Sequence, residues 1–384
     1  MQAYLDNSAT TRCCERAKER MVSLLTEDYG NPSSLHGMGK TAEDYIREAG
    51  RKIAKTLKAE EKEIVFTSGG TESNNMALFG SLAANPRFGK HIVTTSIEHA
   101  SVYAPICCLK EQGYEITYLN VDREGKISLS QLKDVIRADT ALVSIMMVNN
   151  EIGTVEPISE AAQVIKQINP RTLFHVDAIQ AYGKYRIYPK KTGIDMLSVS
   201  GHKIHAPKGV GFLYIKDKVK VKPLVYGGGQ QNGMRSGTEN VSGIAALGEA
   251  AEEAYENFEQ KAEHMARLRK RFLHGMAEIP SVLVNGGMGA DAAPHIVSVS
   301  IEGVRSEVML HALEEKKIYV SAGSACSSNK PAVSRTLAGI GLARKYLDAT
   351  IRFSFCANTT EEEIDYAVAA MKELVPNLQK YTHH

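Results

Sequence analysis

Short apolar segments alternate with helical patterns over residues 63–215 of the chain. The apolar segments predict β-strands, and apolar residues at every third or fourth position predict helices between them. The predicted strands are 63–67, 91–95, 115–119, 141–148, 172–176, 195–200 and 209–215, and the predicted helices include 72–82, 100–112, 129–137 and 158–168. This alternation predicts an α/β fold with a mostly parallel, seven-stranded sheet that helices cover on both faces. No helix separates the last two strands, so we expect an antiparallel edge strand that begins at 209–211.

The pattern changes after residue 240. Residues 241–278 are rich in alanine and charged residues and predict one long helix. Short strands and helices follow and predict a smaller α+β domain, with strands at 295–301, 318–321 and 350–355 and helices at 306–316, 332–338 and 361–374. The first dozen residues have no partner nearby and are expected to join this domain. We therefore expect a large domain over 15–255 and a small domain formed by 1–14 and 256–384.

Length and composition restrict the class of protein. A chain of 384 residues favours two domains over one core. A net charge of +2 without a run of Lys and Arg argues against nucleic-acid binding. No apolar run is long enough to cross a membrane, and the N-terminus lacks the features of a secretory signal. We therefore expect a cytoplasmic protein.

Six cysteines occur, and none form a C-x-x-C pair, which argues against a zinc ribbon or a thioredoxin-like site. Cys107 and Cys108 lie in an apolar helical pattern and are predicted to be buried. Cys326 instead lies among small and polar residues at 321–331. An accessible thiol on a loop suits a nucleophile that reaches a substrate and then carries cargo away. The same pattern also fits a loop thiol without a function.

Lys203 and Asp177 each follow an apolar strand and together suggest a pyridoxal-phosphate site. A lysine that forms a Schiff base with this cofactor needs a carboxylate that keeps the pyridine nitrogen protonated, and Asp177 can supply it. Ser200 and His202 can donate to the phosphate, and Gln180 can donate to the phenolic oxygen of the ring. Taken alone, Asp177 also fits a helix cap and Lys203 a solvated loop lysine.

A strand, a glycine turn and a helix follow one another at residues 63–82. Gly70 lets the backbone approach an anion closely, and Thr71 adds a hydroxyl group next to the N-terminus of the helix. The same residues also fit an ordinary capped turn. His99 follows the next strand and can stack on a pyridine ring or transfer protons, although a lone loop histidine is usually a surface residue.

Arg352 is an arginine within an apolar strand, where an unpaired charge is costly. A clamp on the carboxylate of an amino acid is the functional interpretation, and Asn150 at the end of another strand can assist. The glycine-rich residues 227–240 suit a loop over an anion site and also fit an ordinary surface loop.

Taken together, these segments resemble the cysteine desulfurases of the Nif/Isc type, class-V aminotransferases with the fold type I of pyridoxal-phosphate enzymes. The resemblance runs essentially from end to end, and the segment Gly323-Ser324-Ala325-Cys326-Ser327-Ser328 is specific to this family. The other matching segments are 4–11, 30–36, 67–74, 98–99, 149–153, 175–180, 200–203, 235–240 and 352–354.

The resemblance implies a role for each matching residue. Lys203 would bind pyridoxal phosphate, His99 would stack on its ring, and Cys326 would attack the sulfur of L-cysteine to form a persulfide while alanine is released. Lys203 and His99 would also transfer protons. Asp177 and Gln180 would contact the ring of the cofactor, and Asn150 and Arg352 would bind the substrate. The phosphate would be bound by Gly70, Thr71, Ser200 and His202 of the same chain and by Thr238 of the partner subunit. The shared site implies a homodimer.

The resemblance also implies a sulfur-acceptor protein, such as an iron–sulfur scaffold or a tRNA-thiolation enzyme. It implies no resident metal, although Cys326 is a candidate for a transient iron–sulfur ligand with a scaffold. A selenocysteine lyase shares the cofactor, the fold and often the cysteine, and it is the nearest alternative. An aminotransferase of the same fold would not need Cys326. A non-catalytic protein on the same scaffold would be expected to have lost Lys203, Asp177 or Cys326.

Overall fold

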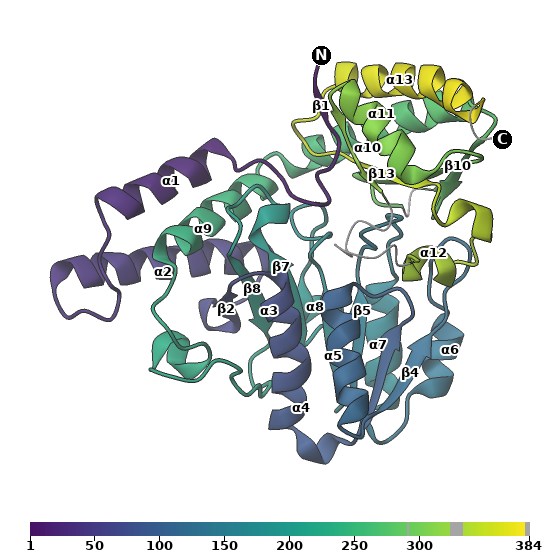
Figure 1. The fold of residues 1–384 in the computed structure, drawn as a ribbon. Coiled ribbons are helices and arrows are strands. Elements are labelled where there is room, and N and C mark those ends of the chain that lie inside the picture. The colour runs from purple at the N-terminus through teal and green to yellow at the C-terminus, as the bar shows by residue number, and fades with distance from the viewer. Residues whose placement is uncertain (290–291, 323–332, 381–384) are drawn as a thin grey trace.

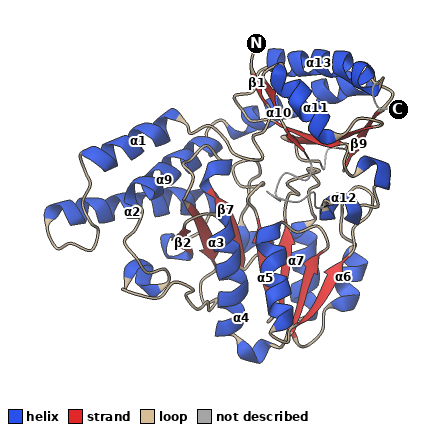
Figure 2. Cartoon of the chain, viewed as in Figure 1, coloured by secondary structure: helices blue, strands red, loops and turns tan. Residues whose placement is uncertain are grey.

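The computed structural model describes residues 1–289, 292–322 and 333–380 and contains a central seven-stranded sheet (Figures 1 and 2). Its strands lie in the order β2-β8-β7-β6-β5-β3-β4. They are β2 (Ile64–Thr67), β3 (His91–Thr95), β4 (Glu115–Leu119), β5 (Thr140–Met146), β6 (Leu173–Asp177), β7 (Met196–Ser200) and β8 (Gly211–Ile215). All pairs among β3–β7 are parallel, and β8 is antiparallel to both neighbours. The predicted α/β fold is confirmed.

The edge position predicted for the last strand is wrong. β8 lies inside the sheet between β7 and β2, and the edge strands are β2 and β4. Thr67 of β2 pairs with Gly211 of β8, so β2, the first of these strands in the sequence, forms the edge next to β8, the last one. Phe212, Leu213 and Tyr214 are fully buried, as an inner strand with both faces covered requires.

Helices cover both faces of the sheet because successive strand residues point to opposite sides. Val143 and Phe212 pack in one hydrophobic cluster, and their neighbours Leu142 and Leu213 pack in another. The first cluster includes residues of α2 (Gly37–Leu57), α6 (Leu129–Val135), α7 (Ile158–Ile168) and α9 (Val241–Tyr255). The second includes residues of α4 (Ser81–Ala84), α5 (Ala100–Glu111) and the π-helical turn Met76–Gly80, which follows α3 (Gly70–Asn75). The predictions above did not include α1 (Glu15–Thr26) and α2.

The burial predicted for Cys107 and Cys108 is wrong. Cys107 is half-buried and Cys108 is exposed. The buried face of α5 is formed by residues such as Val102, Ile106 and Leu109, at helical spacing. The two cysteines lie off that face because neighbouring residues on a helix point in different directions.

A second, antiparallel sheet has the order β12-β13-β10-β9 and packs against helices of the C-terminal part. Its strands are β9 (Val282–Asn285), β10 (Ile296–Ile301), β12 (Ser321–Ala322) and β13 (Thr350–Ser354), and its helices are α10 (Phe258–Ala277), α11 (Ser306–Glu315) and α13 (Glu361–Gln379). The N-terminal β1 (Ala3–Tyr4) pairs in parallel with β11 (Ile318–Tyr319), so the start of the chain joins the part that contains α13 (Figure 1). The strand predicted at 318–321 is therefore two strands with different partners.

The single long helix predicted for residues 241–278 is wrong, because the chain breaks between α9 and α10. Glu256 is extended with ψ 134°, and Asn257 is left-handed with φ 50°. Asparagine tolerates this conformation better than most residues. α9 packs against α1 and α2, whereas α10 packs against α13. We propose that this break separates the domain 15–255 from the C-terminal part of the domain 1–14 and 256–384.

The helix predicted at 332–338 is α12 (Arg335–Gly339), which begins three residues later than predicted. Ser334 accepts a hydrogen bond from the Leu337 amide and caps this helix. No helix in the described part of the chain is long and apolar enough to span a membrane.

Candidate active site

A cavity of about 540 Å³ lies at the carboxyl ends of the central parallel strands, where ligands bind in open α/β sheets. Ten of the predicted site residues line it: Gly70, Thr71, His99, Asn150, Asp177, Gln180, Ser200, His202, Lys203 and Arg352. Thr238 is exposed and does not line this cavity within one chain. Cys326 lies outside the described residues.

Asp177 ends β6 and is buried at the base of the cavity. Its Oδ2 accepts a hydrogen bond from Asn74 Nδ2 at 2.8 Å, and its Oδ1 accepts one from the Ile179 amide at 3.0 Å. Burial raises the pKa of the Asp177 carboxyl, and the two donors together with nearby His99 and Lys203 oppose this shift. A cation next to Asp177, such as a protonated pyridine nitrogen, would favour the ionised carboxylate.

Asn74 was not predicted as a site residue. It lies four residues after Gly70 in α3, so both residues lie on the same face of this helix. The spacing alone does not reveal the contact with Asp177, which lies 103 residues further along the chain.

Lys203 lies in the 3-10 turn Gly201–Lys203, directly after β7. Its Nζ donates to the main-chain carbonyls of Ser8 and Ala9, at 2.5 Å each. Gln180 Nε2 donates to the same carbonyl of Ser8 at 2.9 Å. The N-terminal segment therefore orients two of the predicted cofactor ligands, a function that the sequence did not reveal.

His99 caps α5 and has a defined tautomer. Its Nδ1 accepts a hydrogen bond from the Ser101 amide at 3.1 Å and lies 2.8 Å from Ser101 Oγ. Burial lowers the pKa of the His99 imidazole, the charge of Lys203 lowers it further, and Asp177 opposes the shift. Because Nδ1 accepts a hydrogen bond, the neutral form of the ring carries its proton on Nε2, which is then a donor.

Gly70, Thr71, Ser200 and His202 lie at one end of the cavity. A Cβ atom on Gly70 would lie 2.2 Å from Ile179 Cδ1, so a larger residue would force the Ile179 side chain to move. His202 Nδ1 lies 3.2 Å from Thr10 Oγ1, and burial together with neighbouring lysines lowers the pKa of His202 to about 4.

The cavity residues fit pyridoxal phosphate. A lysine amine, a buried carboxylate and a glycine turn with hydroxyl groups form a set that suits its aldehyde, its ring nitrogen and its phosphate. Two buried oxygens on the cavity lining, Ser8 Oγ and Glu98 Oε2, have no hydrogen-bond partner within the described residues. Such orphaned polar atoms indicate space for a polar ligand.

Arg352 lies on β13, and its side chain is 9% exposed. Nη1 donates to the Asn150 carbonyl at 2.8 Å, and Nη2 donates to Asp6 Oδ1 at 3.0 Å and to Ser321 Oγ at 3.1 Å. Its Nε is buried without a partner among the described residues. Three of the five N–H groups are used, so the guanidinium is held in place on the cavity wall and two N–H groups remain, one on Nη1 and one on Nε.

Arg335 and Tyr103 form a further part of the wall that the sequence did not predict. The Arg335 guanidinium carbon lies 3.0 Å from the centre of the Tyr103 ring, and Nη2 donates to the Ser96 carbonyl at 3.2 Å. Ser334 donates to a carboxylate oxygen of Glu151. These contacts hold residues 333–336 against the large sheet, and no local pattern indicates them.

Comparisons with known proteins identify the family. Residues 3–367 match the family model described as "Aminotransferase class-V". A curated relative from Methanosarcina thermophila, named "Cysteine desulfurase IscS", is 43% identical over 376 residues, which are 98% of this chain and 92% of the relative. The chain belongs to the cysteine desulfurases of the class-V aminotransferase family. Enzymes of this family use pyridoxal phosphate, as the cavity residues require.

Solved structures agree with this membership. A structure titled "NIFS-LIKE PROTEIN" has a TM-score of 0.93 and 37% identity, and the match covers 98% of this chain and all of that one. A second structure, "SspA in complex with cysteine", has a TM-score of 0.82 and 34% identity, and the match covers 94% of this chain and 100% of that one. Within the described residues, no group of three or more His, Cys, Asp or Glu side chains is placed to hold a metal ion.

Proposed function

We propose that this protein is a pyridoxal-phosphate-dependent cysteine desulfurase that converts L-cysteine to L-alanine and carries the sulfur as a persulfide on Cys326. The convergence of Lys203, Asp177 and Arg352 on one cavity supports the proposal most directly. These residues supply an amine for the cofactor, a carboxylate for its ring and a cation for the substrate carboxylate. The cofactor, when bound, withdraws electrons from the substrate.

Each predicted site residue on the cavity wall has a stated role in this proposal. Lys203 Nζ would bind the cofactor and transfer a proton to or from the substrate. Asp177 would favour a protonated ring nitrogen, Gln180 would donate to the phenolic oxygen, and His99 would lie beside the ring and move a proton through Nε2. The phosphate is held by Gly70, Thr71, Ser200 and His202.

Arg352 and Asn150 hold the substrate through its carboxylate. The Arg352 guanidinium is fixed by Asp6 and Ser321, so little side-chain freedom is lost when a carboxylate binds. The thiolate of Cys326 then forms a sulfur–sulfur bond with the substrate, and the carbon–sulfur bond breaks. The electron pair stays on the three-carbon fragment, which takes up a proton and leaves as alanine.

A second copy of the chain completes the site in this proposal. Large apolar side chains are exposed on α1 and the segment that follows it, namely Val22, Leu25, Tyr29 and Leu35, and Tyr226 is exposed near the glycine-rich loop. Apolar surface of this kind favours association. Thr238, exposed in one chain, would then reach the phosphate of the partner subunit.

The persulfide is passed on to an acceptor. We propose a sulfur-acceptor protein such as an iron–sulfur scaffold or a tRNA-thiolation enzyme, in the cytoplasm. With a scaffold, Cys326 would serve as a transient ligand of the iron–sulfur cluster, which is cargo of the reaction.

The test is alanine and sulfide release from L-cysteine with dithiothreitol, together with the visible spectrum of the protein. We expect the wild type to be yellow and active, Cys326→Ala to stay yellow but inactive, and Lys203→Ala to lose the covalently trapped cofactor after borohydride reduction. Lys208→Ala changes an exposed lysine on the same segment and should behave as the wild type.

The same assay distinguishes the alternatives. Full activity of Cys326→Ala would refute the persulfide step. Alanine formation from selenocysteine but not from cysteine would identify a selenocysteine lyase, and amino-group transfer to an added keto acid would identify an aminotransferase.

A further inference from the structure

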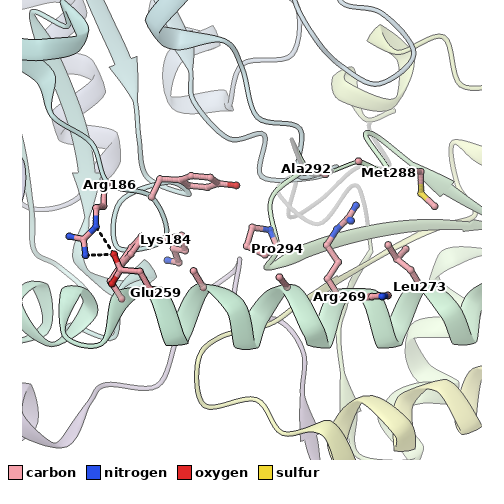
Figure 3. Close-up of a pocket in the computed structure, with 14 residues that line it drawn as sticks. Lys184, Arg186, Glu259, Arg269, Leu273, Met288, Ala292 and Pro294 are labelled. Carbon is pink, nitrogen blue, oxygen red and sulfur yellow. Dashed lines mark hydrogen bonds and ion pairs between the residues drawn. The ribbon is translucent and has the colours of Figure 1, made fainter.

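A second cavity, of about 600 Å³, lies beside α10 and apart from the residues that line the active site (Figure 3). Its floor is one face of that helix, where Glu259, Ala262, Ala266, Arg269 and Leu273 recur at helical spacing. The opposite wall is formed by residues 184–186 and by residues such as Met288, Ala292 and Pro294. The volume suits a small organic molecule.

The charges on this cavity are not balanced. At one end Arg186 is paired with Glu259, with Nη2 2.6 Å from Oε1 (Figure 3). Lys184, Arg269 and Lys270 also line the cavity, and none of them has a carboxylate within 4.0 Å among residues 1–289, 292–322 and 333–380. The remainder of the lining is largely apolar, with Phe258, Ala262, Ala266, Leu273, Met288 and Pro294.

Arg269 has an unused donor. Its Nη2 donates to the Gly287 carbonyl at 2.7 Å, and its Nε is buried with no partner within the described chain. Burial lowers the pKa of the Arg269 guanidinium. A partly desolvated guanidinium on a cavity wall, with no carboxylate partner among the described residues, binds a carboxylate well, because the planar group matches its two oxygens.

Lys184 connects this cavity to the active site. Its Nζ donates to the main-chain carbonyl of Lys203, whose side chain lines the other cavity. Loss of hydration and the charge of Lys203 lower the pKa of the Lys184 ammonium to about 8. An anion beside Lys184 would therefore change the electrostatic potential at Lys203.

We propose that this second cavity binds a small carboxylate with an apolar body and that its occupation is sensed at Lys203. In this proposal Arg269 binds the carboxylate, Lys184 adds a second positive charge to the same cavity, and the apolar body lies against Ala262, Ala266 and Leu273. Only the coupling to Lys203 rests on the proposed function, and carboxylate binding does not.

The binding test is calorimetry of hexanoate with the purified holoenzyme. We expect hexanoate to bind at millimolar concentration or below and hexanamide, which lacks the charge, to bind at least about tenfold more weakly. Arg269→Met should weaken hexanoate binding by about tenfold or more, and Arg267→Met, on the same helix but off the cavity, should leave it unchanged. Ala266→Phe fills the apolar part and should also abolish binding.

The coupling test is a pH titration of the visible absorbance of the bound cofactor. An anion offsets the positive charge of Lys184, so saturating hexanoate should move the midpoint to higher pH in the wild type and not in Arg269→Met. The proposed site is refuted if calorimetry shows no binding of hexanoate at millimolar concentration, or if hexanamide binds as tightly as hexanoate. Binding with an unchanged midpoint overturns the coupling. A colourless protein that still binds hexanoate would refute the proposed function and leave the site standing.

Discussion

Arg352 and Asp6, near opposite ends of the chain, form an ion pair with 3.0 Å between Nη2 and Oδ1. The side chains are 9% and 19% exposed, so the arginine charge is compensated inside the protein. The pairing fixes the Arg352 guanidinium on the wall of the active-site cavity. The N-terminal segment therefore supports the residue that is proposed to hold the substrate.

Replacing Arg352 with lysine should raise the KM for L-cysteine by about tenfold or more, because lysine keeps the charge but cannot make two parallel hydrogen bonds. The visible absorbance of the bound cofactor should be unchanged. Arg344→Lys, at an exposed position, serves as the control. An unchanged KM in Arg352→Lys would show that the carboxylate is held elsewhere.

Asp177→Asn should retain the cofactor but lower kcat by about a hundredfold or more. The amide keeps the shape of the side chain and the hydrogen bond from the Ile179 amide, but it does not stabilise a protonated ring nitrogen. Steady-state rates and the cofactor spectrum measure the two effects separately. Asp139→Asn changes an exposed carboxylate and should have no effect. A variant with wild-type kcat would exclude Asp177 from ring activation.

Glu156 should make the stability of the protein depend on pH. The residue is buried, Oε2 accepts a hydrogen bond from the Ile127 amide, and burial raises the pKa of the carboxyl to about 8, from the 4.5 of an unperturbed glutamate. Because the folded pKa is the higher one, the protonated group favours the folded state at low pH. This contribution is lost as the pH rises from about 4.5 through about 8.

Denaturant titrations at several pH values test this expectation. As the pH rises from 5 to 9, the free energy of unfolding of Glu156→Gln should increase relative to that of the wild type. The difference should grow by ~1 kcal/mol per pH unit, to a few kcal/mol in total. Glu160→Gln, on the exposed face of α7, should show a constant difference. A constant difference in Glu156→Gln would mean that the carboxyl titrates normally.

Replacing Asn257 with alanine should destabilise the folded protein, whereas replacing it with glycine should not. Its φ of 50° is left-handed, which costs a residue with a Cβ atom about 1–2 kcal/mol and costs glycine little. We expect Asn257→Ala to lower the free energy of unfolding by about 1 kcal/mol and Asn257→Gly to leave it nearly unchanged. Gln260→Ala lies in the adjacent first turn of α10 and is the matched control. Equal loss in the alanine and glycine variants would point to side-chain contacts of Asn257 and not to backbone strain.

The order of strands and helices was determined by the sequence itself. The segments 91–95, 115–119 and 158–168 have the same bounds in the structure as in the prediction. Their apolar patterns depend only on neighbours along the chain, and parallel strands need helices between them. Lys203, Asp177 and Gly70 could also be proposed, because each lies at or just after the end of a strand and suits one part of the cofactor: an amine, a carboxylate and a backbone that an anion can approach closely.

The position of each strand in the sheet and the support of each site residue were decided by the tertiary structure. β8 is an inner strand because β2, far away in sequence, pairs with its other side. Asp6 supports Arg352, Asn74 supports Asp177, and Arg335 packs on Tyr103 only after distant segments meet. Such contacts join residues that share no local pattern, so sequence periodicity contains no signal for them, and they form only when the two sheets pack around the cavity.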